Sequence, residues 1–184
     1  MSAAVAPELV GVPVIETARL RLRAPCLADF EVEAGYWASD RSAFTGGPMG
    51  RPRAWRVLAA LIGHWAMRGY GWWTLEERSG EDRAGAVVGR VGLWFPEGWP
   101  EPEIGWTLFT GAEGQGYATE AAAAARAHAY GALGWRTAIS LIDAGNHRSE
   151  AVARRLGARP EGEFDHFGEW RARVWRHPAA EDAA

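Results

Sequence analysis

The sequence contains no lysine, so all 20 basic residues are arginine, and it contains one cysteine, Cys26. A single cysteine cannot form an internal disulfide, so nothing indicates an oxidising compartment. No stretch approaches about 18 uninterrupted apolar residues, and residues 1–7 carry no basic residue, so neither a transmembrane helix nor a secretory signal is expected. We therefore expect a cytoplasmic protein without a membrane partner.

An excess of either charge is also missing, because 23 acidic and 20 basic residues leave a formal net charge of −3. Bulk attraction to nucleic acid is not indicated, so any polyanion must be held locally. The lack of lysine excludes a Walker phosphate loop, which needs Gly-Lys-Ser/Thr. Hydrophobic residues make up 48% and charged residues 23% of the 184 positions, which is typical of a folded protein. We expect a single domain over residues 1–184, with flexible ends at 1–13 and 178–184.

The hydrophobic pattern predicts short strands interspersed with helices. Strands are predicted at 19–23, 72–75, 87–95, 103–108, 137–142 and 171–175, and helices at 27–37, 53–68, 117–133 and 149–156. Turn residues across 77–85 predict an antiparallel hairpin. The strand, helix and strand from 103 to 142 imply a right-handed parallel crossover. The predicted fold class is α/β (α+β), with a mixed sheet.

A glycine-rich segment, Gly111 to Glu120, stands between a predicted strand and an alanine-rich helix. The free N–H groups and partial positive charge of a helix N-terminus suit a phosphate. Gly114 and Gly116 have no Cβ, so their backbone can come close to an anion, and Thr119 could add a hydroxyl. The dinucleotide fingerprint fits poorly, because Thr119 stands where a third glycine is needed. The alternative is a glycine-rich turn that only starts a helix.

Five segments, in order, resemble the GCN5-related N-acetyltransferase (GNAT) superfamily. Its acyl-CoA loop reads Gln/Arg-x-x-Gly-x-Gly/Ala, and residues 113–118 occupy it with Glu113 at the first position. The other similar segments are Glu16 to Arg23, Gly46-Gly47-Pro48, Glu103-Ile104-Gly105-Trp106, and Asn146 to Ser149 with Leu156-Gly157-Ala158. The resemblance is closest to the branch that includes the ribosomal-protein alanine acetyltransferases (RimJ/RimL-like). It implies a mostly antiparallel sheet, helices on both faces, and a splayed parallel strand pair that forms the acyl-CoA cleft.

The resemblance also implies a reaction, in which an acetyl group passes from acetyl-CoA to a primary amine of a protein N-terminus or a small molecule. The backbone of Thr107, Leu108 and Phe109 would pair with the pantetheine as an added strand does, and an N–H of this strand would stabilise the oxyanion. The diphosphate would be held by Gly114, Gln115, Gly116, Tyr117, Ala118 and Thr119. No metal is implied, and the scattered histidines offer no ligand spacing.

The reaction needs a proton acceptor, because an amine arrives largely protonated at neutral pH. Glu103 is the leading candidate, since the resemblance often places an acid or its water partner there; the alternative is a solvated strand end. His64, His128 and His147 have suitable side chains as well. Ser149 takes, by resemblance, the role of a hydroxyl that assists the leaving thiolate, and its alternative role is the N-cap of the following helix.

Two further residues are assigned to the acyl-CoA. Asn146 would bond the pantetheine, and its alternative is an Asx turn through Gly145. Arg154, with its neighbours Arg148 and Arg155, could reach the 3′-phosphate-bearing ADP, unless these arginines are solvated surface.

The loop before the strand at 103 predicts the character of the acceptor entrance. Glu97, Glu101 and Glu103 surround Trp99 and would make this entrance acidic, which favours a basic acceptor. Aromatic rings there could also hold a cationic amine.

Two other functions stay open at this stage. One is a non-catalytic acyl-CoA-binding or sensing module of the same fold, which would release no free thiol when amines are supplied. The other is a different α/β nucleotide binder, which would bind a dinucleotide without needing the pantetheine arm. The sequence leaves the acceptor and the oligomeric state open, with a homodimer as one alternative.

Overall fold

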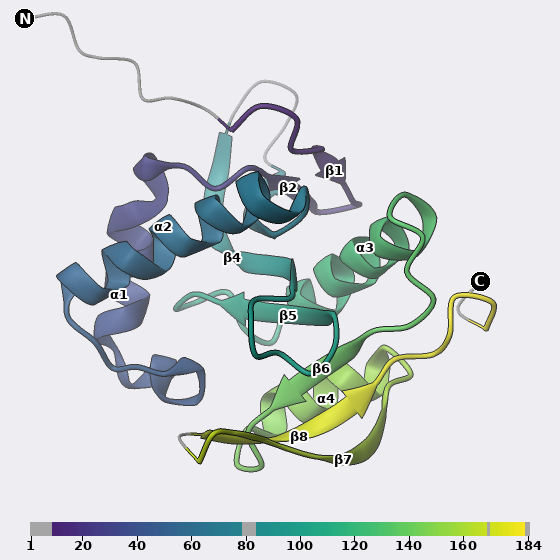
Figure 1. Cartoon of the computed structure of the whole chain (residues 1–184). Helices are drawn as coiled ribbons and strands as arrows, with labels where there is room; N and C mark the ends of the chain where they lie inside the picture. Colours follow the sequence, from purple (N-terminus) through teal and green to yellow (C-terminus); the bar gives the residue numbers. More distant parts are fainter. Residues whose placement is uncertain (1–8, 79–83, 169, 183–184) are drawn as a thin grey trace, which may run out of the picture.

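The computed structural model describes residues 9–78, 84–168 and 170–182. They form an eight-stranded sheet in the order β1-β2-β3-β4-β5-β6-β8-β7 (Figure 1). The strands are β1 (Ile15–Glu16), β2 (Leu20–Arg23), β3 (Trp72–Arg78), β4 (Ala84–Trp94), β5 (Glu103–Leu108), β6 (Ile139–Ile142), β7 (Arg159–His166) and β8 (Trp170–Arg176). Neighbouring strands are antiparallel except β5 and β6, which are parallel. The expected mixed sheet and its parallel junction are therefore confirmed.

Four α-helices and two short 3-10 helices occur in the described part of the chain. They are η1 (Leu27–Asp29), α1 (Phe30–Ala38), η2 (Asp40–Thr45), α2 (Arg51–Arg68), α3 (Tyr117–Gly131) and α4 (His147–Arg155). None of the helices described is both long and apolar enough to cross a bilayer.

Helices cover both faces of the sheet, as neighbouring residues of β4 show. Val91 and Leu93 lie in the core cluster that contains the alanines of α3, whereas Arg90, directly before Val91, forms an ion pair with Glu33 of α1. Because successive side chains of a strand point to opposite faces, α1 and α3 lie on opposite sides. α2 lies beside α1 (Figure 1), and α4 lies beside α3, where the Arg126 guanidinium donates to the carbonyl of Leu156 at 2.6 Å.

The alanine content of α3 determines how closely this helix approaches the sheet. Ala121, Ala122, Ala125 and Ala129 are fully buried and belong to one cluster with the large side chains of β2, β3 and β4. Alanine is the strongest helix former and has the smallest side chain that still favours a helix. The large side chains of this core therefore come mostly from the sheet, and the small alanine side chains let α3 pack close to it.

The predicted strands and helices are all present, with ends that differ by a few residues. The predicted hairpin turn lies partly in 79–83, outside the described residues, but β3 and β4 pair antiparallel as expected. Sequence analysis missed the short β1, the helix η2 and the long β7. β7 contains Pro160 and Gly162, and most of its side chains are exposed, so it has no alternating apolar pattern.

Parts of the expected flexible ends are packed. Leu9 and Val12 lie against the main core cluster, and the carbonyl of Pro13 accepts a 2.8 Å hydrogen bond from the Trp73 indole. Near the other end, the carbonyl of Pro178 accepts from the Tyr130 hydroxyl at 2.8 Å.

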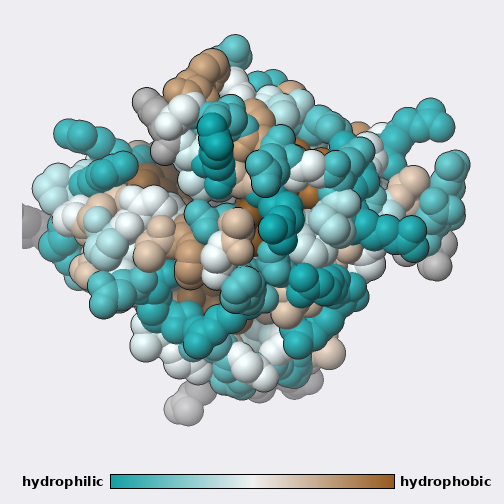
Figure 2. Space-filling view, turned by 90° about the horizontal axis from the view of Figure 1, so that it is seen from below, coloured by the Kyte–Doolittle hydropathy of each residue, from teal (hydrophilic) through white to brown (hydrophobic). Residues whose placement is uncertain are grey.

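From below, on the side of β7 and β8, the surface is mostly hydrophilic, with hydrophobic residues visible in the gaps (Figure 2).

Candidate active site

The parallel strands β5 and β6 stay together over a single register pair, Glu103 with Ile139, in the described chain. There the N–H of Ile139 donates to the carbonyl of Pro102 at 3.0 Å. Beyond this pair, side chains replace the backbone ladder: the Ser140 hydroxyl donates to the Ile104 carbonyl at 2.6 Å, and the Leu141 N–H donates to Glu103 Oε1 at 3.1 Å. The strands therefore diverge toward Leu108 and Ile142, and the region between them, where the resemblance implies the acyl-CoA cleft, is called the cleft below.

Glu103 lies at the closed end of this cleft and is buried, with 8% of its surface exposed. The interpretation as a solvated strand end is therefore wrong. Its Oε2 accepts a 2.6 Å hydrogen bond from the Trp99 indole, and its Oε1 accepts from Leu141. Burial raises the pKa of Glu103 to about 7, although both hydrogen bonds favour the charged form. A carboxylate with this pKa can take up a proton near neutral pH.

One edge of β5 has free backbone groups inside the cleft. The Ile104 carbonyl points toward β6, and backbone groups two residues apart in a strand point the same way, so those of Trp106 and Leu108 also face the cleft. The Phe109 N–H instead donates to the Val88 carbonyl on the β4 side at 2.9 Å. Alternation places Thr107 on that side as well. Of the three residues predicted to contact the pantetheine, only Leu108 points its backbone into the cleft, and Trp106, which was not predicted, points there as well.

The glycine-rich loop joins β5 to α3 and leaves the start of α3 without a side-chain cap. Gly114 and Gly116 have φ values of 76° and 83°, in the left-handed region that favours glycine. An ideal Cβ on Gly114 would meet no atom within 4 Å, so the backbone conformation, not crowding, requires glycine there. The N–H groups of Tyr117, Ala118 and Thr119 have no partner within the helix because they belong to its first turn. The loop can therefore present donors to an anion.

Two residues from the turn between β1 and β2, Thr17 and Arg19, hold this loop and the start of α3 in place. Glu120 of α3 accepts hydrogen bonds from the Thr17 hydroxyl at 2.6 Å and from the backbone N–H and side-chain Nε of Arg19 at 2.9 and 2.7 Å. The guanidinium of Arg19 also donates to the carbonyl of Gln115 at 2.7 Å. The turn at residues 17–19 is thus bonded to the glycine-rich loop and the first turn of α3, about 100 residues away in the sequence.

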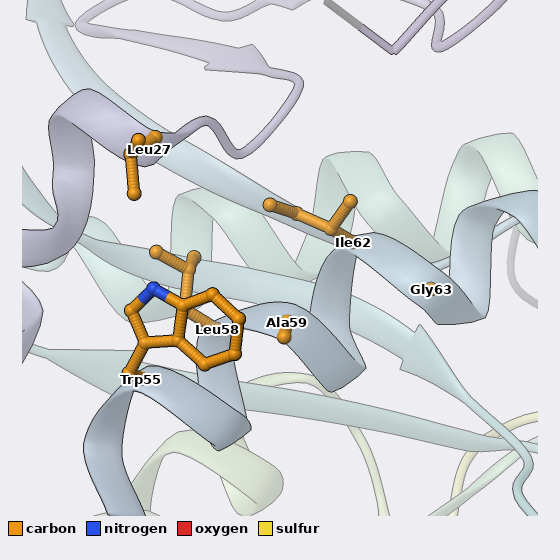
Figure 3. Close-up of a pocket in the computed structure, with 6 residues that line it drawn as sticks. All are labelled: Leu27, Trp55, Leu58, Ala59, Ile62 and Gly63. Atoms are coloured by element: carbon orange, nitrogen blue, oxygen red, sulfur yellow. The ribbon is translucent and has the colours of Figure 1, made fainter. Parts of the chain in front are cut away.

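An apolar groove on the outer side of α2 has a different character. It is lined by Leu27, Trp55, Leu58, Ala59, Ile62 and Gly63 (Figure 3). None of these side chains takes up or releases a proton near neutral pH, so the cleft between β5 and β6 is the candidate site for acid–base chemistry.

Comparison with known proteins agrees with this geometry, because a family model described as an acetyltransferase (GNAT) domain matches residues 19–159. The chain belongs to the GNAT acetyltransferase family. It is 32% identical to an acetyltransferase from Agrobacterium tumefaciens, with 95% of this chain and 99% of that chain covered and a TM-score of 0.82.

Two more distant structures share the GNAT fold. RimL, a ribosomal L7/L12 α-N-protein acetyltransferase in complex with coenzyme A, is 18% identical, with 94% of this chain and 100% of that chain covered and a TM-score of 0.71. Ribosomal-protein-S5-alanine acetyltransferase from Vibrio fischeri is 17% identical, with 94% and 100% covered and a TM-score of 0.66.

In this GNAT chain, the loop between β6 and α4 brings Asn146 and Ser149 together. Asn146 Oδ1 accepts a 3.1 Å hydrogen bond from the Ser149 N–H, so Asn146 is the N-cap of α4 and Ser149 is not. The expected Asx turn belongs to Asp143, whose Oδ1 accepts from the Gly145 N–H at 2.9 Å. Arg154 forms a 3.1 Å ion pair with Glu150. Within the described part of the chain, the hydroxyl of Ser149 and the amide NH2 of Asn146 make no hydrogen bond, so both remain for other partners.

The alternative bases have structural roles or lie at the surface. His64 is buried, and its Nε2 accepts from the Phe95 N–H at 3.1 Å while its Nδ1 lies 2.8 Å from the Tyr70 carbonyl, so both ring nitrogens are used. His128 packs edge-to-face on Trp73. His147 is largely exposed on α4. Among the candidates considered, Glu103 alone is buried in the cleft.

The acidic entrance expected of this GNAT chain is largely neutralised. Glu101 forms two 2.6 Å hydrogen bonds with the Arg176 guanidinium, which lowers the pKa of Glu101, and Glu103 is buried. Only Glu97 of the three is exposed. The Trp72 ring covers Gly105 on the same face, since an ideal Cβ there would lie 2.5 Å from it. Of the three carboxylates expected at the entrance, Glu97 alone is therefore both exposed and free of an ion pair in the described part of the chain.

Proposed function

We propose that this protein transfers an acetyl group from acetyl-CoA to a primary amine, on a protein N-terminus or a small molecule, by direct attack. The observation that carries the proposal is the position of Glu103. A buried carboxylate with a pKa of about 7 lies where β5 and β6 separate, in the cleft where the GNAT family holds its acyl donor. RimL has been described with coenzyme A bound, and a GNAT relative that confers microcin C7 self-immunity with acetyl-CoA and AMP.

The residues of the cleft fit an acyl-CoA. The uncapped N–H groups at the start of α3 suit a diphosphate, and the backbone groups of Trp106 and Leu108 suit the amides of a pantetheine chain. Asn146, whose amide NH2 is not used by its capping bond, would donate to the same chain. Arg154 would reach the ADP only by exchanging its partner Glu150.

Each step has a residue of this chain to perform it. Glu103 accepts the proton of the attacking ammonium, directly or through a water molecule, so that the amine can form the new C–N bond. A backbone N–H of β5, from Trp106 or Leu108, stabilises the oxyanion at the carbonyl carbon. As the C–S bond breaks, the Ser149 hydroxyl donates a proton to the thiolate, and the second proton that the attacking nitrogen loses on forming the amide restores the hydroxyl. A thiol of pKa about 8.5 leaves readily, so this help is modest.

The test combines binding with turnover. Calorimetric titration with acetyl-CoA measures affinity, and a thiol reagent then records free CoA while peptides with free N-termini and small amines are supplied. Release of thiol with at least one amine supports the proposal. Binding without release from any amine indicates a sensing module, and affinity for a dinucleotide without affinity for acetyl-CoA indicates another nucleotide binder.

A further inference from the structure

The helix η2 spans the open end of the cleft. Arg41 of η2 forms an ion pair with Glu113 in the loop that follows β5. Phe44 of η2 lies over Gly145 in the loop that follows β6, since an ideal Cβ on Gly145 would be 3.2 Å from the Phe44 ring. In Figure 1 this blue turn after α1 lies at the end toward which β5 and β6 run. One short segment thus contacts both arms of the cleft.

The position of Arg41 is fixed from behind. The buried Ser42 donates to the carbonyl of Ser39 at 2.8 Å, and Tyr36 bonds Thr45 through its hydroxyl at 2.8 Å. The ring of Tyr36 in turn packs against Phe109 at the end of β5, with ring centroids 5.4 Å apart. These contacts tie η2 to the strand that carries the cleft, so the Arg41 guanidinium reaches the phosphate loop from a supported backbone.

The charges of the loop make this contact informative. Glu113 occupies the position where the GNAT signature has Gln or Arg, and its Oε2 accepts from the Gly111 N–H at 3.1 Å. An unpaired carboxylate beside a diphosphate would repel it, and Arg41 removes that charge. The Nε–H of Arg41 and the Oε1 of its partner Glu113 are both buried without a hydrogen-bond partner among the residues that the structure describes. The Arg41 side chain as a whole is 31% exposed, so its outer N–H groups remain accessible to a phosphate oxygen.

We propose that Arg41 binds the diphosphate of the acyl donor, so that η2 supplies the side-chain cation that the loop itself lacks. The planar guanidinium has five N–H donors, enough to hold both Glu113 and a phosphate oxygen. Glu113 keeps the guanidinium at the loop before the anion arrives. The inference rests on the proposed function only in that the ligand is a coenzyme A thioester.

A double-mutant cycle separates this role from simple neutralisation of Glu113. Calorimetry with coenzyme A is carried out on the wild type, Arg41→Gln, Glu113→Gln and the double variant. If Arg41 contacts the diphosphate, Arg41→Gln lowers affinity about tenfold even in the Glu113→Gln background. If Arg41 only neutralises Glu113, the substitution has no effect in that background, and the inference is overturned.

Shortened ligands identify the group that Arg41 contacts. The loss should persist with 3′-dephospho-CoA, which keeps the diphosphate, and vanish with pantetheine, which lacks it. A loss that disappears with 3′-dephospho-CoA would assign Arg41 to the 3′-phosphate and overturn the diphosphate contact. Arg171→Gln, which breaks an exposed ion pair with Asp165 on the β7–β8 hairpin, is the matched control and should keep wild-type affinity.

Two further measurements keep the test decisive. Thermal unfolding shows whether Arg41→Gln folds; if it does not, Arg41→Lys retains the charge but not the planar fork, and we still expect a loss of about threefold or more. Wild-type affinity in a folded Arg41→Lys variant would contradict a fork contact. Failure of the wild type to bind coenzyme A would overturn the proposed function itself, whereas normal wild-type binding with no effect of Arg41 would overturn this inference alone.

Discussion

The hydroxyl of Ser140 donates a 2.6 Å hydrogen bond to the carbonyl of Ile104, across the parallel strands β6 and β5. In a continuing parallel ladder that carbonyl would accept from the Leu141 N–H, which turns to Glu103 instead. His177 lies behind, with Nε2 2.9 Å from the Ser140 oxygen, and burial lowers the pKa of His177 to about 3. Neutral His177 therefore donates to Ser140, and side chains end the ladder where the cleft begins.

Ser140→Ala should destabilise the protein. The substitution leaves the buried carbonyl of Ile104 and the ring of His177 without their partner, which costs about 1–3 kcal/mol. Urea unfolding measures the change in the free energy of unfolding. Ser149→Ala is the control, because its hydroxyl makes no hydrogen bond within the described structure, and it should unfold at the wild-type urea concentration. Equal midpoints for both variants would show that Ser140 does not hold the strands.

Glu103→Gln should abolish most activity while the protein still binds acetyl-CoA. An amide cannot accept the proton of the amine, and loss of a general base typically lowers the rate about 10²- to 10⁴-fold. Because Glu103 must be deprotonated to act, wild-type kcat/KM should rise as the pH passes about 7, and this rise should be absent in the variant. Rates are compared across pH with one amine. An unchanged profile in the variant would assign the base elsewhere.

The same carboxyl should make stability depend on pH. Burial raises the pKa of Glu103 from 4.5 to about 7, so the folded protein keeps a proton that the unfolded chain has lost in this window. Its contribution is therefore present below pH 4.5 and is lost as the pH rises to 7, by about 3 kcal/mol in total. The difference in the free energy of unfolding between wild type and Glu103→Gln should follow this slope. Glu97→Gln, with an exposed carboxyl in the preceding loop, should keep the wild-type slope.

Replacing Gly114 and Gly116 together by valine should weaken binding of acetyl-CoA at least tenfold. Both glycines have positive φ, which costs a residue with a Cβ about 1–2 kcal/mol, so the loop must move its N–H groups. Calorimetry measures the affinity. Gly131→Ala, at the other end of α3 with open space at its Cβ, is the control and should bind normally. Unchanged affinity in the double variant would mean that the loop does not hold the anion.

The sequence predicted local features well, because local signals specify them. The hydrophobic pattern located β2 and β5, and two glycines located the loop that the structure places at the start of α3. β7 was not predicted, because it pairs only with β8 in the described sheet and most of its side chains are exposed. Its sequence therefore lacks the alternation of apolar and polar residues that marks a strand with one buried face.

Contacts between distant segments could not be predicted in the same way. Nothing near Glu113 indicates that Arg41 is its partner, since the two meet only after η2 folds against α1. The burial of Glu103 likewise depends on Trp99 closing over it from the preceding loop. Once the Ile104 carbonyl is known to face β6, counting alternate residues shows that the backbone groups of Trp106 and Leu108 also face β6. Those of Thr107 and Phe109 face β4.

The bridge made by η2 has a mechanical consequence. The segment touches both arms of the cleft and is bonded to α1, whose Tyr36 and Trp37 rings pack beside Arg90 on the face opposite α3. If the loops that follow β5 and β6 move apart, η2 must move with at least one of them. The rings of Tyr36 and Trp37 then shift as well. A change in the separation of β5 and β6 is therefore expected to displace side chains on the face of the sheet opposite α3.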